Sequence, residues 1–271
     1  MSTPIPRALT IAGSDSGGGA GIQADLKTFQ ELDVFGMSAI TAITVQNTLG
    51  VQGVYPLPPE AAAEQIDAVS SDLGVDALKT GMLFSADIIT AVSERIREHG
   101  WRNVVVDPVM IAKGGAELLL SDAVQAIKER LLPLALIVTP NIPEAEVLSG
   151  IRIQSMEDRR EAAKRISAYG PATVVIKGGH DEGSERVTDL LYDGAAFTEF
   201  SGQRIDTPHT HGTGCTYSAA LAAGLAKGLS VPEAVEAARA FIQAAIEDGL
   251  GLGQGHGPTN HWAYRRRGER R

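Results

Sequence analysis

The segment 210–216, THGTGCT, places glycines and a single cysteine just before a stretch with helical periodicity. Main-chain amides freed by Gly212, Thr213 and Gly214, added to the positive end of a helix dipole, would stabilise a transferring phosphoryl group. Cys215 would lie in the first helical turn, where a thiol with a lowered pKa can accept a proton from a substrate hydroxyl. The alternative is that Cys215 is a small buried apolar residue. The pattern predicts an anion hole with Cys215 as the candidate base.

A second glycine-rich segment, residues 13–21 with the sequence GSDSGGGAG, lies between an expected strand and an expected helix. Glycines allow close approach of the backbone to a ligand, and amides at a helix N-terminus point toward an acceptor. The segment matches neither a Walker A loop nor a dinucleotide-binding fingerprint. It is therefore either a ligand-binding loop or only a tight strand-to-helix turn.

Polar side chains follow three further apolar runs. Asn141 and Glu144 come after one run, Asp107 after another, and Lys177 ends a third. Ligands of open α/β sheets bind at the carboxyl ends of the strands, so we expect these side chains to share one crevice. Asp107 and Glu144 could hold Mg²⁺ through water, and Lys177 could meet a phosphate. A helix capping box is the alternative for Asn141 and Glu144.

The elements that must position these residues alternate between short apolar runs and helix-length amphipathic stretches, which is typical of a mostly parallel sheet. The expected strands are Ala8–Ala12, Ser38–Val45, Asp76–Thr80, Asn103–Val106, Leu136–Thr139 and Thr173–Lys177. The expected helices are Ile22–Leu32, Glu60–Leu73, Ala86–His99, Asp122–Arg130, Asp158–Tyr169, Gly214–Lys227 and Pro232–Gly249.

One antiparallel element is expected. Residues 187–192 and 196–200 read as a β-hairpin, because the Asp193-Gly194 pair suits a tight type I′ turn. We expect a single domain over residues 1–264 and a disordered basic tail over residues 265–271.

Composition narrows the class of protein. The chain has 271 residues, 44% of them hydrophobic, and a formal net charge of −9, which disfavours nonspecific binding to nucleic acid or to an anionic membrane. One cysteine excludes an intramolecular disulfide and fits a reducing compartment. The first residues lack a secretory signal, and no apolar run is long enough to span a membrane. We therefore expect a cytoplasmic protein.

Taken in order, seven segments closely resemble the hydroxymethylpyrimidine/phosphomethylpyrimidine kinases of thiamine biosynthesis, in the ribokinase superfamily. They are GSDSGGGAGIQADLKTF, TAITVQNTLGV, KTGMLF, VVVDPVMIAKGG, TPNIPEAEVLSG, IKGGH and THGTGCT, spread from about Ala8 to Trp262. The resemblance implies a three-layer αβα ribokinase-like fold with an eight- to nine-stranded sheet, a homodimer, and ATP with Mg²⁺. It also implies two successive phosphorylations, of 4-amino-5-hydroxymethyl-2-methylpyrimidine and then of its monophosphate.

The resemblance also implies roles for individual residues. It assigns to the pyrimidine pocket Gly13, Ala20, Asp25, Gln46 and Met82, and to ATP Asn141, Lys177, Gly214 and the loop around Val187. The carboxamide of Gln46 offers an acceptor and donors that suit an aminopyrimidine edge. Most ribokinase relatives carry Asp where this kinase family, like this chain, carries Cys215.

Two other functions stay open. A pyridoxine/pyridoxal kinase branch is similar, but it carries a lid cysteine where this chain has Met110 and lacks the pair found here at Gln46-Asn47. Residues Met110, Lys113 and Gly114 then read as a mobile lid, or else as an ordinary surface loop. A catalytically idle ligand-binding homologue is the less favoured alternative.

Overall fold

The computed structural model describes residues 4–110, 122–180 and 185–269 of the chain. Its strands are β1 (Arg7–Ala12), β2 (Phe35–Ile40), β3 (Ala42–Asn47), β4 (Gly50–Pro56), β5 (Ala77–Thr80), β6 (Val104–Val106), β7 (Ile137–Val138), β8 (Thr173–Ile176), β9 (Arg186–Tyr192) and β10 (Phe197–Gln203). Its α-helices are α1 (Gly21–Glu31), α2 (Pro59–Asp72), α3 (Ala86–His99), α4 (Ala123–Ala126), α5 (Ile142–Ser149), α6 (Met156–Ser167), α7 (Thr213–Ala226), α8 (Val231–Glu247) and α9 (Ala263–Glu269). A π-helical turn, η1 (Ile127–Leu131), and a 3₁₀ turn, η2 (Leu132–Leu134), continue α4.

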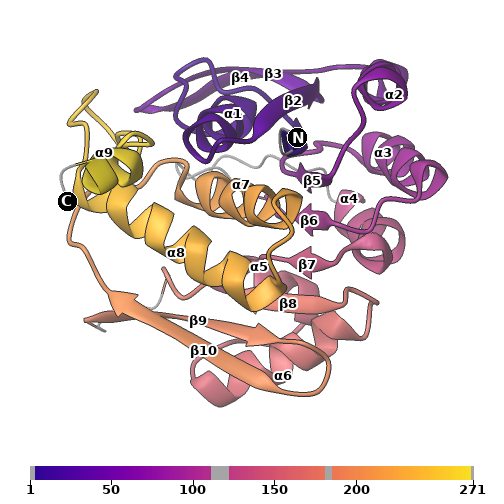
Figure 1. Ribbon diagram of the computed structural model, residues 1–271. Coiled ribbons are helices and arrows are strands. Elements are labelled where there is room, and N and C mark those ends of the chain that lie inside the picture. Colours follow the sequence, from indigo (N-terminus) through magenta and orange to yellow (C-terminus); the bar gives the residue numbers. More distant parts are fainter. Residues whose placement is uncertain (1–3, 111–121, 181–184, 270–271) are drawn as a thin grey trace.

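The described strands form an eight-stranded sheet in the order β10-β9-β8-β7-β6-β5-β1-β2, and β3 and β4 form a separate two-stranded sheet. Strands β1, β2, β5, β6, β7 and β8 are parallel, whereas β9 runs antiparallel to both of its neighbours. Figure 1 shows helices in front of and behind this sheet. The expected three-layer, mostly parallel α/β architecture is confirmed.

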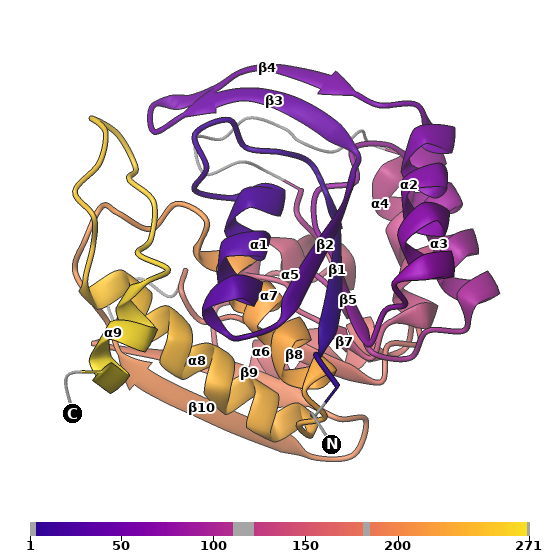
Figure 2. The same cartoon turned by 45° about the horizontal axis from the view of Figure 1, so that its top comes forward.

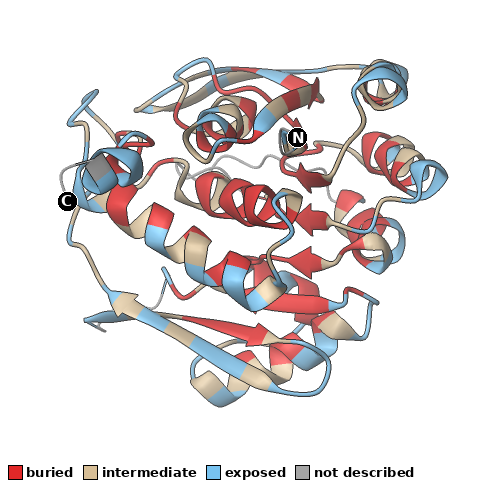
Figure 3. Ribbon diagram, in the orientation of Figure 1, coloured by how far each residue is buried: buried red, intermediate tan, exposed pale blue. Residues whose placement is uncertain are grey.

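Both faces of the sheet are buried because alternate residues of each strand point to opposite sides. Leu9 and Ile11 pack in one core with α2, α3 and α6, while Ala8, on the opposite side of the pleat, packs in the other with α1, α7 and α8. The same alternation divides Val104 and Val106 from Val105. In Figure 3 the inner strands and the inward faces of the helices are accordingly coloured as buried.

The expected single strand over Ser38–Val45 is wrong, because the chain leaves the central sheet at Thr41. The Thr41 amide donates to the Ala12 carbonyl at 3.1 Å, and its hydroxyl donates to the Met82 carbonyl at 2.7 Å. Strand β3 then pairs antiparallel with β4, a strand that the sequence did not indicate. Figure 2 shows this pair lying across the carboxyl ends of β1 and β2.

The expected hairpin is present as β9–β10, but its turn differs from the predicted one. Four residues separate the paired Tyr192 and Phe197, and only Gly194, not Asp193, has a positive φ. The Asp193 carboxylate accepts from the amides of Ala195 and Ala196 at 2.9 and 2.7 Å, so a side chain closes the turn. The pair is also not the single antiparallel element, since β3–β4 is another.

The basic C-terminal stretch does not begin a frayed tail at residue 265, because α9 extends through Glu269. Arg267 forms an ion pair with Glu247 of α8, at 2.5 Å, which fixes the helix against its neighbour. Within the described residues, no helix combines the length and the apolar character needed to cross a membrane.

Candidate active site

Side chains from several strand ends meet at the carboxyl edge of the sheet, as the sequence predicted. Lys177, just after β8, donates to Asp107, just after β6, with an Nζ–Oδ1 distance of 2.8 Å. Asp107 also accepts from the hydroxyls of Thr139 and Ser218, each at 3.3 Å. Because Ser218 belongs to α7, this network joins the sheet edge to the helix that begins at Thr213.

The network stabilises the ionised forms of both Asp107 and Lys177. Burial opposes ionisation of Asp107, but the ammonium groups of Lys177 and Lys79 outweigh it and hold the pKa of this carboxyl below its usual range. Burial likewise opposes the charge of Lys177, yet Asp107 and Glu144 raise its pKa above the usual value. The site therefore presents a permanent cation, which suits a phosphate.

Asn141 and Glu144 form the capping box that was the alternative interpretation. The Asn141 Oδ1 accepts from the Glu144 amide at 2.9 Å, and the Glu144 carboxylate accepts from the Asn141 amide at 2.8 Å. Burial raises the pKa of Glu144 to about 7, although Lys177 acts in the opposite direction. Asn141 also bridges to Lys177 through the main chain, so the capping box lies directly beside the cation.

The sequence predicted an anion hole at the start of α7. Gly212 is its N-cap, with φ of 77°, and a Cβ placed there would lie 1.7 Å from the carbonyl oxygen of Gly19. The amide and the hydroxyl of Thr213 both donate to the Thr210 carbonyl. The amides of Gly214 and Cys215 belong to the first turn, where a helix provides no acceptor of its own. These two donors and the helix dipole can bind an anion.

Gly214 also leaves room for that anion beside the cation. A Cβ at Gly214 would come within 3.3 Å of the Lys177 Nζ and 3.8 Å of an Asp107 carboxylate oxygen. A side chain here would fill the space between the α7 amides and Lys177. The Lys177 ammonium therefore lies next to the first turn of α7.

The expected lowering of the Cys215 pKa is wrong for this structure. The thiol is partly buried, and burial raises its pKa to about 11 despite the nearby Lys79. Asp25 and Asp107 raise it further, while a hydrogen bond from the Gly21 amide lowers it. Burial thus outweighs any lowering of the thiol pKa by the helix N-terminus, and the thiol is protonated at neutral pH.

The first glycine segment is organised by its own aspartate. The carboxylate of Asp15 accepts from the amides of Gly17, Gly19 and Ala20 at 2.8 to 3.0 Å, and it lies 2.8 Å from Nε2 of His211. Burial acts against ionisation, but these partners, His211 first, hold the pKa of Asp15 below its usual range. The amides expected to face a ligand therefore serve the loop itself.

Of the residues assigned to the pyrimidine pocket, Gly13 contacts Met82, and Gln46 and Ala20 lie beside the Asp15 loop. The Gly13 amide donates to the Met82 carbonyl at 3.1 Å, and a Cβ at Gly13 would lie 2.3 Å from the Met82 methyl. Gln46 accepts from the Thr44 hydroxyl at 3.2 Å, and its amide nitrogen lies 3.5 Å from the His211 ring. Ala20, the residue before α1, belongs to the adjoining Asp15 loop.

Asp25 differs from the expectation of a direct substrate contact. Its side chain has no exposed surface, and both carboxylate oxygens accept from Lys79, at 2.9 and 3.0 Å. Thr10 adds a third hydrogen bond at 2.5 Å. The structure therefore makes Asp25 a counterion below the pocket.

Two other expectations concern loops. Val187 belongs to β9, where its carbonyl accepts from Arg239 at 3.2 Å, and so it is not in a loop. Met110 is buried and packs in the core shared with α3 and α5. Lys113 and Gly114, the rest of the expected lid, lie outside the described residues.

Sequence reasoning missed three residues of this region: Asp15, His211 and Lys79. Asp15 could have been found, because an aspartate followed by several glycines often accepts from the backbone amides of its own loop. The partners of His211 and Lys79 are separated from them by 196 and 54 residues, so no local signal indicated either contact.

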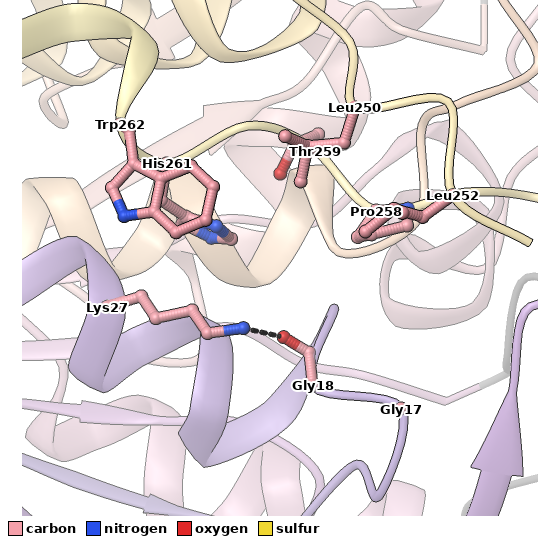
Figure 4. Close-up of a pocket in the computed structure, with 9 residues that line it drawn as sticks. All are labelled: Gly17, Gly18, Lys27, Leu250, Leu252, Pro258, Thr259, His261 and Trp262. Carbon is pink, nitrogen blue, oxygen red and sulfur yellow. Dashed lines mark hydrogen bonds between the residues drawn. The ribbon is translucent and has the colours of Figure 1, made fainter. Parts of the chain in front are cut away.

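A separate pocket of about 160 Å³ lies between the first glycine segment and the C-terminal region (Figure 4). It is lined by Gly17, Gly18, Lys27, Leu250, Leu252, Pro258, Thr259, His261 and Trp262. Lys27 donates to the Gly18 carbonyl at 2.6 Å across its floor. None of the residues expected in the site lines this pocket.

Comparisons with known proteins agree with this geometry. The hydroxymethylpyrimidine/phosphomethylpyrimidine kinase of Bacillus subtilis (strain 168) is 58% identical over 262 residues, which are 97% of each chain. The pyridoxine kinase of the same strain is 49% identical and covers 96% of this chain and 97% of its own. The pyridoxal kinase from Staphylococcus aureus, solved in complex with AMP-PCP and pyridoxal, superposes with a TM-score of 0.90 at 41% identity. It covers 97% of this chain and 96% of its own.

The sheet and its flanking helices are thus the ribokinase-like arrangement that the sequence resemblance implied. The family described as phosphomethylpyrimidine kinase matches residues 15–260, which include most of the first glycine segment, all of the second, the Asp107–Lys177 network and Cys215. The chain belongs to the phosphomethylpyrimidine kinase family.

Proposed function

We propose that this protein uses ATP to phosphorylate 4-amino-5-hydroxymethyl-2-methylpyrimidine and then its monophosphate, in thiamine biosynthesis. The observation that supports this choice is the comparison within one organism. The pyrimidine kinase of Bacillus subtilis is 58% identical to this chain, whereas the pyridoxine kinase of the same strain is 49% identical over a similar length.

The pyrimidine ring would lie between Gly13, Met82 and Gln46. The Gln46 carboxamide can pair with an exocyclic amine and the adjacent ring nitrogen, and Met82 offers an adaptable apolar wall. His211, whose Nε2 donates to Asp15, lies beside the Gln46 side chain and would limit its position. The ring would therefore be recognised on the side of the site where β3 crosses the sheet edge.

The phosphates would lie at the opposite side, between Lys177 and the start of α7. The amides of Gly214 and Cys215 would stabilise charge on the transferred group, and Lys177 would neutralise it. Asn141, whose main chain bridges to Lys177, would contact ATP.

Asp107 and Glu144, the carboxylates beside the proposed phosphate position, fit a magnesium ion that is held mainly by ATP. Asp107 and Glu144 affect each other's ionisation, and oxygen ligands are those that Mg²⁺ prefers. Both are engaged by protein donors, and the described residues contain no cluster of three metal-ligating side chains. We therefore assign them water-mediated contacts to Mg²⁺, which would neutralise phosphate charge.

Release of ADP tests the proposal. Purified protein should release ADP with the pyrimidine alcohol and with its monophosphate, and more slowly with pyridoxal. A Lys177→Met variant, prepared in parallel, controls for contaminating kinases. Turnover of pyridoxal alone would support the pyridoxal kinase alternative, and pyrimidine binding without any ADP would support an idle binding protein.

The proposal includes two further expectations: a homodimer, which the family resemblance implies, and a cytoplasmic location, which the composition favours. Light scattering on the purified protein should give twice the mass of the 28.5 kDa chain. Cell fractionation should recover the ADP-releasing activity in the cytoplasmic fraction.

A further inference from the structure

A third glycine-rich stretch, residues 249–258 with the sequence GLGLGQGHGP, follows α8 and is called the C-terminal glycine loop below. Figures 1 and 2 show it beside the tip of the β3–β4 pair. Two of its amides bond to Thr48, the first residue after β3. The His256 amide donates to the Thr48 carbonyl at 2.9 Å, and the Gly255 amide donates to the Thr48 hydroxyl at 3.4 Å. The loop therefore holds the turn that joins β3 to β4.

The approach of the loop to Thr48 requires glycine at two positions. A Cβ at Gly255 would lie 2.1 Å from the Thr48 carbonyl oxygen, and a Cβ at Gly253 would lie 2.2 Å from the Thr48 hydroxyl oxygen. By contrast, a Cβ at Gly251 would meet no atom within 4 Å, and one at Gly249 would make only ordinary contacts of 3.8 Å or more. Side chains are thus excluded at Gly253 and Gly255 by this one turn.

The same loop also contacts the segment that leads into α7. The Gly257 carbonyl accepts from the His211 amide at 3.1 Å, and the Thr259 amide donates to the His211 carbonyl at 3.4 Å. Pro258, between them, forms a parallel bridge with His211. Because Gly257 directly follows His256, two neighbouring residues connect the β3–β4 turn to the residue that precedes the N-cap of α7.

This connection joins the two halves of the proposed site. Thr48 lies two residues beyond Gln46, which would read the pyrimidine, and His211 lies just before the amides that would hold the phosphoryl group. Strand β3 belongs to the two-stranded sheet, whereas α7 packs on the eight-stranded one, so the hydrogen bonds of a single sheet do not fix their separation. A misplacement of about 1 Å between reacting groups can cost about 100-fold in rate.

We propose that Gly253 and Gly255 are positioning residues for the pyrimidine substrate. By allowing the C-terminal glycine loop to approach Thr48, they hold Gln46 at a fixed distance from the start of α7. The part that concerns the substrate rests on the proposed function. The part that concerns the β3–β4 turn does not, since it is a property of the free protein.

Hydrogen exchange of the free protein measures the position of the turn. In Gly255→Ala the new methyl group displaces the Thr48 carbonyl, so the amides of residues 45–51 should exchange at least tenfold faster than in the unaltered protein. The matched control is Gly249→Ala, because neither glycine has a positive φ and only Gly249 has room for a Cβ. The control should stay within twofold, and the amides of β1 should exchange alike in all three proteins. Equal exchange at residues 45–51 in the two variants would overturn the proposal.

Steady-state release of ADP measures the effect on the substrate. Gly255→Ala should lose at least tenfold in kcat/KM for the pyrimidine alcohol, with KM for ATP changed less than threefold, whereas Gly249→Ala should leave both within twofold. An unchanged kcat/KM, or an equal loss toward ATP, would show a merely structural role. If the unaltered protein released no ADP with the pyrimidine, the proposed function would be wrong, and exchange at residues 45–51 would still decide whether the loop holds the turn.

A milder variant keeps the test decisive should Gly255→Ala not fold. Gly253 is exposed, and its Cβ would meet the side chain of Thr48 rather than the main chain. Its matched control is Gly251→Ala, since Gly253 and Gly251 have similar positive φ values of 80° and 63°. Exchange at residues 45–51 should be at least threefold faster in Gly253→Ala than in Gly251→Ala. Equal rates in these two variants would reject the contact with Thr48 as the reason for glycine.

Discussion

Glu144 should make the protein less stable as the pH rises through neutrality, and Glu144→Gln should remove this effect. Its folded pKa of about 7 lies above the ordinary value of 4.5 because the carboxyl is buried beside Asp107. A raised folded pKa means that the folded protein binds the proton more tightly than the unfolded chain does. The stabilisation is therefore complete below pH 4.5 and lost as the pH rises through 7.

The size of the effect follows from the two pKa values. A folded pKa of about 7 against 4.5, at 1.36 kcal/mol for each unit, gives a full effect of about 3 kcal/mol. Most of this is lost between pH 5 and pH 8. Glutamine resembles the protonated acid and can also serve in a capping box. The free energy of unfolding of Glu144→Gln should therefore rise by roughly 2–3 kcal/mol, relative to the unaltered protein, between these pH values.

Urea unfolding at pH 5 and at pH 8 measures this difference. The matched control is Glu233→Gln, because Ser230 and Glu233 form the same capping box at the start of α8. Glu233 is exposed, and its hydrogen bonds to Ser230 lower its pKa, so its replacement should cost stability at pH 8 rather than add it. A stability difference for Glu144→Gln that is the same at both pH values would refute the burial argument.

Three further predictions concern the site. Gly212→Ala should lower kcat/KM at least 100-fold, because its Cβ would strike the Gly19 carbonyl, whereas Gly228→Ala, with a similar positive φ but open space, should leave kcat/KM within threefold. His211→Ala should lower kcat/KM at least tenfold, and His211→Gln, whose amide nitrogen can take the place of Nε2, should recover most of it; equal losses would exclude a positioning hydrogen bond. Gln46→Leu should weaken pyrimidine binding by about 1–3 kcal/mol, measured by calorimetry, and unchanged affinity would reject its role in reading the ring.

Much of the fold could be predicted because its strands are buried on both faces. Continuous apolar runs such as Val104–Val106 then stand out between amphipathic helices. The prediction failed where tertiary contacts decide the course of the chain, as at Thr41, whose hydroxyl and amide are fixed by residues distant in the sequence. Strand β4 was missed because Gly50, Gly53 and Pro56 weaken its strand signal.

The positions of the site residues were predictable, but their electrostatics were not. Strand ends must meet at one sheet edge, and this places Asp107 beside Lys177 as expected. The pKa of Cys215 depends instead on burial and on Asp25 and Lys79, which contact each other across 54 residues of sequence. No local pattern contains that information.

The two glycine segments look alike in sequence and perform opposite tasks. In the first, the carboxylate of Asp15 already accepts from the amides of the loop. In the second, Gly212 has no side chain that could cap α7, so the amides of Gly214 and Cys215 stay available for an anion. The first loop also supports the second segment, because Gly212 packs directly against Gly19. The proposed anion hole of α7 thus rests on a loop in which the amides of Gly17, Gly19 and Ala20 already have an acceptor.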